Sequence, residues 1–71
     1  MKVRFEIDPH RKGAAVLLTE HGEEVTRIDC WTQTYQGRAH ALEHFERYLH
    51  HAGKPLKEGE RLAFTIMELA R

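Results

Sequence analysis

The residues of this sequence best suited to bind a metal ion, or to change charge near neutral pH, are its histidines, which number six in 71 residues. Four of them, His40, His44, His50 and His51, lie in one short stretch. His40 and His44 are spaced i, i+4, so on a helix they can hold one divalent ion from a single face. A complete site needs further ligands, and at helical spacing neither Glu43 nor His51 stands beside this pair. His40 and His44 are therefore candidate metal ligands without a completed site.

On a helical wheel His40, His44 and His51 fall close together, opposite the apolar positions, and we call these three residues the histidine ridge. We expect the ridge to face solvent. Three interpretations stay open for it: a solvated surface, a surface that binds a partner, and a metal-binding site.

Other groups with catalytic potential are few. Cys30 lies in a strand-like segment, where a buried and unreactive thiol is expected. The chain has no serine, which excludes a serine nucleophile, and its glycines are isolated, so no phosphate-binding loop is present. Several carboxylates match, by their order along the chain, the acidic residues of ribonuclease H-type nucleases, although charged edges of a solvated sheet explain them better; these are Glu6 or Asp8, Glu43 or Glu46, and Glu68. We expect no enzyme activity and no cofactor, and the sequence identifies no small-molecule substrate.

The composition excludes several classes of partner. Eleven Lys and Arg residues balance eleven Asp and Glu residues, whereas nonspecific binding to nucleic acid or to an anionic membrane needs a basic excess. The longest apolar run, residues 14–18, is too short to span a bilayer. A single cysteine forms no intramolecular disulfide, and the strand-like pattern from Lys2 onward leaves no signal peptide. We expect a cytoplasmic protein that binds neither nucleic acid nor membrane.

Hydrophobic periodicity divides the chain into strands and one helix. Alternation of period two predicts the first strands, and apolar positions at helical spacing predict the helix. The last segment fits both a helix and a strand, and its aromatic and β-branched residues favour a strand. The predicted elements are strands at residues 2–8, 14–19 and 24–32, a helix from an N-cap at Thr34 to residue 51, and a final strand within residues 61–69.

This β-β-β-α-β order predicts a single α+β domain over residues 1–71. Two hairpins and a crossover through the helix give a four-stranded sheet of order 3-2-1-4, with the last strand parallel to the first. The helix is expected to pack on one face of the sheet and to leave the other face uncovered. The expected core comprises Val3, Phe5, Ile7, Leu42, Phe45, Leu49 and Phe64.

The first strand and the helix carry a family likeness. Residues 1–5 (MKVRF) and the helical stretch at residues 39–48 (AHALEHFERY) resemble the corresponding parts of small HicB-type antitoxin domains, which share this order of elements. The likeness spans roughly the first fifty residues, a substantial part of one small domain. It implies an antitoxin-type α+β domain. The chain departs from the family at residues 33–37 (QTYQG), where such domains have a tight Gly-Asp-Thr turn.

The uncovered sheet face is where the sequence places a function. We expect a non-enzymatic interaction or regulatory module that forms a homodimer or binds another protein. The contact is predicted on the uncovered face or along the edge of the strand at residues 24–32, centred on that strand and on Trp31. Aromatic residues, Met and Arg are enriched in such interfaces. The predicted partner-binding residues are Leu17, Arg27, Trp31 and Met67, with Leu69 as a further candidate.

Overall fold

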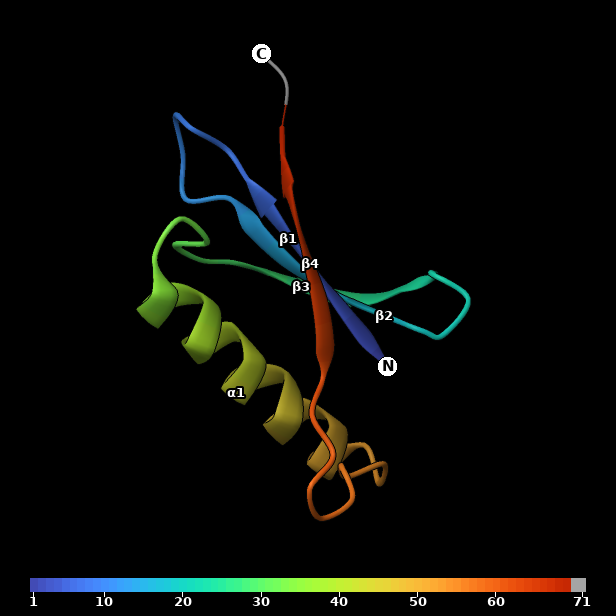
Figure 1. Ribbon diagram of the computed structural model, residues 1–71. Coiled ribbons are helices and arrows are strands. Elements are labelled where there is room, and N and C mark those ends of the chain that lie inside the picture. The colour runs from blue at the N-terminus through green and yellow to red at the C-terminus, as the bar shows by residue number, and fades with distance from the viewer. Residues whose placement is uncertain (70–71) are drawn as a thin grey trace.

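A computed structural model describes residues 1–69 of the chain. The elements follow the order β1 (Lys2–Ile7), β2 (Ala14–Leu18), β3 (Glu24–Asp29), α1 (Tyr35–His51) and β4 (Ala63–Glu68), as Figure 1 shows. They form one four-stranded sheet of order β3-β2-β1-β4 with a single helix, which confirms the predicted α+β fold. Within residues 1–69, no helix is both long and apolar enough to cross a membrane.

The register of the sheet decides which side chains share a face. β1 pairs antiparallel with β2 and parallel with β4, so that Val3 stands opposite Leu17 on one side and Phe64 on the other. Directly paired residues point to the same face of a sheet. Val3, Leu17 and Phe64 therefore all point toward the face that carries α1.

Local signals set the ends of α1 where the sequence predicted them. The side chain of Thr34 caps the N-terminus, because its hydroxyl oxygen accepts a hydrogen bond of 3.0 Å from the main-chain N–H of Gly37. The helix ends at His51, and Gly53 follows with a φ of +77°, in the left-handed region that glycine adopts without strain. The ambiguous last segment is a strand, as its residue types favoured.

β3 is shorter than predicted and ends at Asp29. The reason lies at Thr32, which is fully buried and donates its hydroxyl to the main-chain oxygens of Glu6 (2.9 Å) and Lys12 (3.1 Å). These bonds tie the chain to the β1–β2 connection rather than to a straight extension of β3. Trp31 thus lies beyond the sheet, in the turn that leads to α1.

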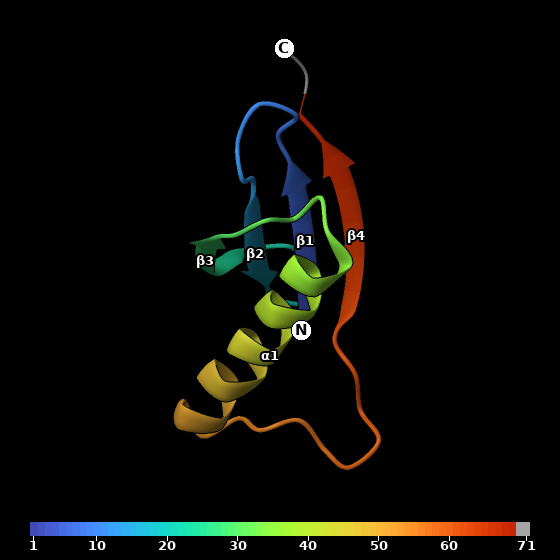
Figure 2. The same ribbon diagram turned by 90° about the vertical axis from the view of Figure 1, so that its left-hand side faces the viewer.

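The core lies between α1 and the sheet. In Figure 2 the helix starts in front of β1 and runs away from β4, which forms the opposite margin of the sheet. The buried residues of α1 are Ala41, Phe45 and Leu49. The buried cluster that they form with the sheet and with the segment before β4 comprises Val3, Phe5, Ala15, Leu17, Cys30, Ala41, Phe45, Leu49 and Leu62.

Several predicted placements are wrong. Ile7 was expected in the core, but it is only half-buried and does not belong to the buried cluster. Leu17 was expected on the uncovered face, but it is fully buried under α1 because its register partner is Val3. Phe64 was expected in the core, but half of it is exposed, since α1 runs away from β4. The residues of β2 that do lie on the uncovered face are Ala14, Val16 and Leu18, because their register partners are Glu6, Arg4 and Lys2.

Candidate functional site

An ion-pair network covers the middle of the face that α1 leaves open. Val16, on the central strand β2, stands opposite Arg4 of β1 and Arg27 of β3. Glu6 joins the two arginines, with its carboxylate 3.1 Å from Arg4 Nη2 and 3.6 Å from Arg27 Nη1. Although no helix covers it, Val16 is fully buried beneath these side chains. This part of the sheet is therefore a charged layer and not an apolar surface.

Arg27, one of the predicted partner-binding residues, is held within this network. Its Nη2 atom lies 2.6 Å from Glu24 Oε1 and its Nε donates to Glu24 Oε2 at 3.1 Å. This hydrogen-bonded contact lowers the pKa of the Glu24 carboxyl and raises the pKa of the Arg27 guanidinium, so both groups stay charged at neutral pH. Arg27 therefore serves first to cover Val16 and to guard the outer edge of β3.

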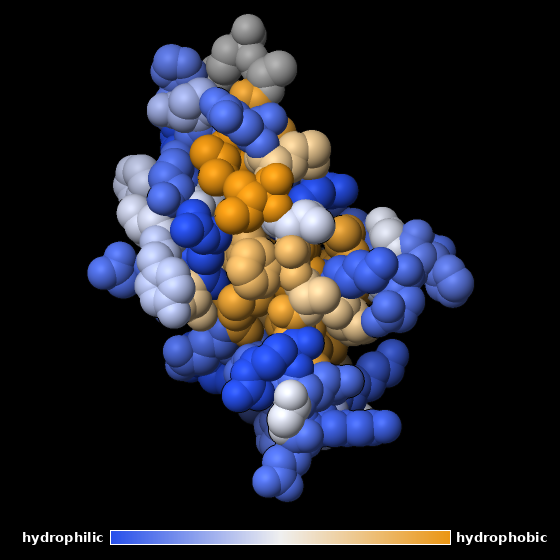
Figure 3. All heavy atoms as spheres, in the orientation of Figure 1, coloured by the Kyte–Doolittle hydropathy of each residue, from blue (hydrophilic) through white to orange (hydrophobic). Residues whose placement is uncertain are grey.

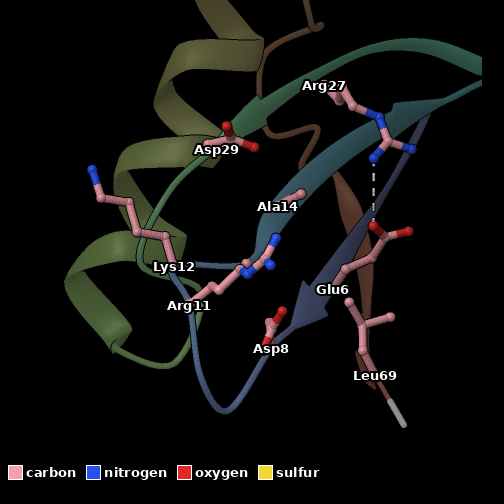
Figure 4. A pocket seen from close by; sticks show the side chains of 9 residues that line it. Glu6, Asp8, Arg11, Lys12, Ala14, Arg27, Asp29 and Leu69 are labelled. Atoms are coloured by element: carbon pink, nitrogen blue, oxygen red, sulfur yellow. Dashed lines mark ion pairs between the residues drawn. The ribbon is translucent and has the colours of Figure 1, made fainter. Parts of the chain in front are cut away.

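A charged cleft of about 380 Å³ opens beside this network, at the end of β1 (Figure 4). Its acidic and basic side chains are interspersed around the rim, so that opposite charges compensate one another instead of building a strong field for one kind of ion. Asp8 is buried, and its carboxylate accepts a hydrogen bond of 2.9 Å from the main-chain N–H of His10. The cleft is lined by Glu6, Asp8, Arg11, Lys12, Gly13, Ala14, Arg27, Asp29 and Leu69.

Trp31 occupies a different place from the one predicted. It is 56% exposed, and it lines a shallow hollow of about 470 Å³ with residues of the first two turns of α1, including Gly37 and His40. The ammonium of Lys12 lies 5.7 Å from the centre of the Trp31 ring, a cation–π distance. Trp31 is therefore a residue of the helix start and does not belong to the open sheet face.

The predicted partner-binding residues do not come together. Leu17 is in the core, and Trp31 lies past the end of β3 at one side of the sheet. Met67 does lie on the uncovered face, 42% exposed and paired with Glu6, but on β4 at the other side, with β1 and β2 between. No single surface formed by Leu17, Arg27, Trp31 and Met67 exists.

Cys30 has the surroundings of a structural thiol. It is buried in the core, 8% exposed. Burial, with a smaller contribution from the charge of Asp29, raises the pKa of the thiol above its usual range. The thiolate that nucleophilic chemistry requires is therefore disfavoured.

The histidine ridge faces solvent, as expected. His40, His44 and His51 are exposed and border one shallow groove with Arg47 and Tyr48. The ring of His44 packs edge-on against that of Phe45 at 5.8 Å. Within residues 1–69, no three His, Cys, Asp or Glu side chains gather in a way that could hold a metal ion. The proposed pair His40 and His44 thus has no third ligand in this part of the chain.

The outer edge of β4 is the feature that the sequence reasoning missed. β1 is the only strand paired with β4 in the described chain, so the opposite edge of β4 presents unpaired main-chain N–H and C=O groups. Its first five residues, Ala63 to Met67, carry no charge and no proline, which are the usual guards of a sheet edge. The signal was present in the predicted strand order, which places this strand at an edge.

Apolar side chains accompany this edge. Phe64 and Ile66 are 50% and 51% exposed on the α1 side of the sheet, where the ring of Phe64 meets that of Phe5 edge-on at 5.4 Å. Figure 3 shows hydrophobic side chains gathered over β4 on the face turned to the viewer. We call Phe64 and Ile66 together with the outer edge of β4 the β4 surface.

Comparisons of this chain with protein families, with functionally described proteins and with solved structures found no match.

Proposed function

We propose that this protein is a non-enzymatic protein–protein interaction module and that the β4 surface makes the contact. The observation that carries the proposal is that Phe64 and Ile66 are both about half exposed on a strand with an unpaired edge. Exposed apolar side chains beside unpaired backbone groups favour docking of another chain. Removing the apolar side chains of the β4 surface from water is favourable, whereas a mixed charged surface offers no such gain in free energy.

The outer edge of β3 is the weaker candidate for this contact. It carries Glu24, Arg27 and Asp29 within six residues, and the first two form an ion pair. Charged side chains on an edge strand oppose the addition of a further strand, because pairing would strip them of water. Of the two open edges, β4 therefore offers the better docking site.

Site-specific photocrosslinking in the cells that produce the protein tests the proposal. A benzophenone amino acid in place of Phe64 is expected to give discrete crosslinked products, and mass spectrometry then identifies the partner. The same group in place of Tyr35, which is 78% exposed at the start of α1, is the matched control and is expected to give none. An absence of products from position 64, or equal products from both positions, would contradict the proposal.

A further inference from the structure

We propose that the β4 surface binds the β4 surface of a second copy of this chain, with the two strands antiparallel and Thr65 on the two-fold axis between them. The proposal rests on the proposed function and names its partner. The result is a continuous eight-stranded sheet, since each copy contributes its four strands. A two-fold symmetric contact of this kind uses the same surface twice, so the strand must be complementary to itself.

The backbone of β4 has the required groups facing outward. The main-chain N–H of Leu69 donates to the oxygen of Ile7 at 2.8 Å, which shows that this residue turns its polar backbone groups toward β1. In a strand, successive residues turn these groups to alternate sides. The N–H and C=O groups of Phe64 and Ile66 therefore point away from β1 and are available to a second strand.

The side chains of β4 complement one another in an antiparallel register about Thr65. Phe64 then stands opposite Ile66 of the second copy, an aromatic–β-branched pair, and Thr65 stands opposite its own copy. Both kinds of pair are favourable in antiparallel sheets. On the other face, the small Ala63 meets the larger Met67 of the second copy. The half-exposed side chains of Phe64 and Ile66 are thus covered reciprocally.

The charges at the two ends of β4 also favour this orientation. Arg61 precedes the strand and Glu68 ends it. An antiparallel second copy brings Glu68 near Arg61 of its partner at each end, whereas a parallel copy would place like charges together. Glu60 is the acidic neighbour of Arg61 in the sequence. Its carboxylate accepts a hydrogen bond of 3.0 Å from the main-chain N–H of Lys57, so it is bound within its own loop.

The interface is small. One strand pairing and two apolar side chains per copy lie at the lower end of the size range of specific interfaces, so we expect a dimer that forms at micromolar concentrations. The helix does not obstruct the approach, because α1 runs away from β4 (Figure 2).

Sedimentation velocity of the purified protein, from about 1 to about 100 µM, tests the association. Wild type is expected to shift from monomer to dimer over this range. Ile66→Lys is expected to remain monomeric at every concentration, with an unchanged circular dichroism spectrum, because a lysine there would be stripped of water by the second strand. Val25→Lys is the matched control, since Val25 is a partly exposed β-branched residue on the opposite edge strand, and it is expected to dimerise like wild type.

Disulfide trapping tests the register of the two strands. It also provides an independent test of the proposal if the Ile66→Lys variant does not fold. Thr65 is exposed, and a residue opposite its own copy in a non-hydrogen-bonded pair has a Cα separation of about 4.5 Å, within the roughly 4.4–6.8 Å that a disulfide spans. Thr65→Cys is therefore expected to form a disulfide-linked dimer on mild oxidation. Ala63→Cys is the control, because its two copies would lie roughly 13 Å apart.

The outcomes separate this inference from the proposed function. A wild-type monomer at the highest concentration would overturn the second copy as the partner. Loss of the dimer in Val25→Lys, or equal trapping of the two cysteine variants, would overturn the antiparallel β4 contact between the copies. Crosslinks from position 64 to a different protein would then still support the interaction module. Dimers that vanish only in Ile66→Lys, with trapping at position 65 alone, support the inference.

Discussion

The carboxylate of Glu6 on β1 reaches across the central strand β2 to within 3.6 Å of the guanidinium of Arg27 on β3. The Glu6 side chain is only 14% exposed, although it lies on the face that no helix covers. Val16 lies beneath the contact and is fully buried. A single-helix domain of this kind thus protects an apolar residue of its second face with paired charges instead of a second layer of secondary structure.

This relationship predicts that Val16, and not the ion pair, carries most of the stability on the open face. Val16→Ala is expected to lower the free energy of unfolding by about 2 kcal/mol, because it removes buried methyl groups. Glu6→Gln is expected to cost at most about 1 kcal/mol, since the pairs are partly exposed and salt screens them. Urea melts at low and high salt measure both. A loss below about 0.5 kcal/mol for Val16→Ala would mean that the layer does not cover this residue.

At Gly37 we expect an exception to the usual preference of helices for alanine over glycine. Replacing glycine by alanine inside a helix usually stabilises it by about 1 kcal/mol. Here a Cβ atom on Gly37 would lie 1.8 Å from the main-chain oxygen of Trp31, which the first turn of α1 packs against. Gly37→Ala is therefore expected to destabilise the protein by at least about 1 kcal/mol.

Thermal or urea unfolding of Gly37→Ala beside Gln36→Ala tests this expectation. Gln36 is an exposed residue of the same helical turn, so its replacement is expected to be neutral or slightly stabilising. A stabilised Gly37→Ala protein would show that the main chain at Trp31 can shift away from the added Cβ atom at little cost in free energy.

The parts of the fold with strong local signals were predictable from the sequence. Alternation in β1, the Thr34 cap and the glycine after α1 each depend on a few neighbouring residues, and all three are confirmed. The strand order followed from the connection rules, since a helical crossover returns the last strand parallel to the first.

The candidate site was not predictable to the same degree, because it depends on register and on the path of the helix. β2 is apolar at every position, so its pattern could not tell whether Leu17 or Val16 faces α1, and only the pairing of Leu17 with Val3 decides. Phe64 has a residue type typical of cores, but α1 runs away from β4. Trp31 lies outside the sheet because the neighbouring Thr32 donates its buried hydroxyl to the main-chain oxygens of Glu6 and Lys12.

The histidine ridge is predicted to be dispensable for folding. Replacing His40, His44 and His51 together by Gln is expected to change the free energy of unfolding by less than about 1 kcal/mol, because all three are exposed. Urea melts measure the change, and elemental analysis of the purified wild type tests for a bound metal. Loss of the fold in the triple variant, or a stoichiometric metal in wild type, would favour the metal-binding interpretation.

Cys30 is predicted to be unreactive in the folded protein. Its burial raises the pKa of the thiol, so at pH 8 the native protein holds little thiolate, and the core also blocks access. Reaction with a thiol reagent such as dithiobis(nitrobenzoate) is expected to be at least about 100-fold slower in native protein than in guanidinium, because it requires an opening of the structure. Equal rates would place Cys30 at the surface.

The raised pKa of Cys30 also predicts a pH dependence of stability. In the unfolded chain the thiol loses its proton near its ordinary pKa of about 8.5, whereas in the folded protein it keeps the proton to higher pH. The unfolded state then binds fewer protons than the folded state, so the free energy of unfolding falls as the pH rises above this value. Below this pH the thiol is neutral in both states and does not make the free energy of unfolding depend on pH.

Urea melts of wild type and Cys30→Ala from pH 7 to about 9.5 measure the difference. Wild type is expected to lose stability more steeply than the variant, and parallel curves would mean that the thiol ionises as freely in the folded protein as in the unfolded chain.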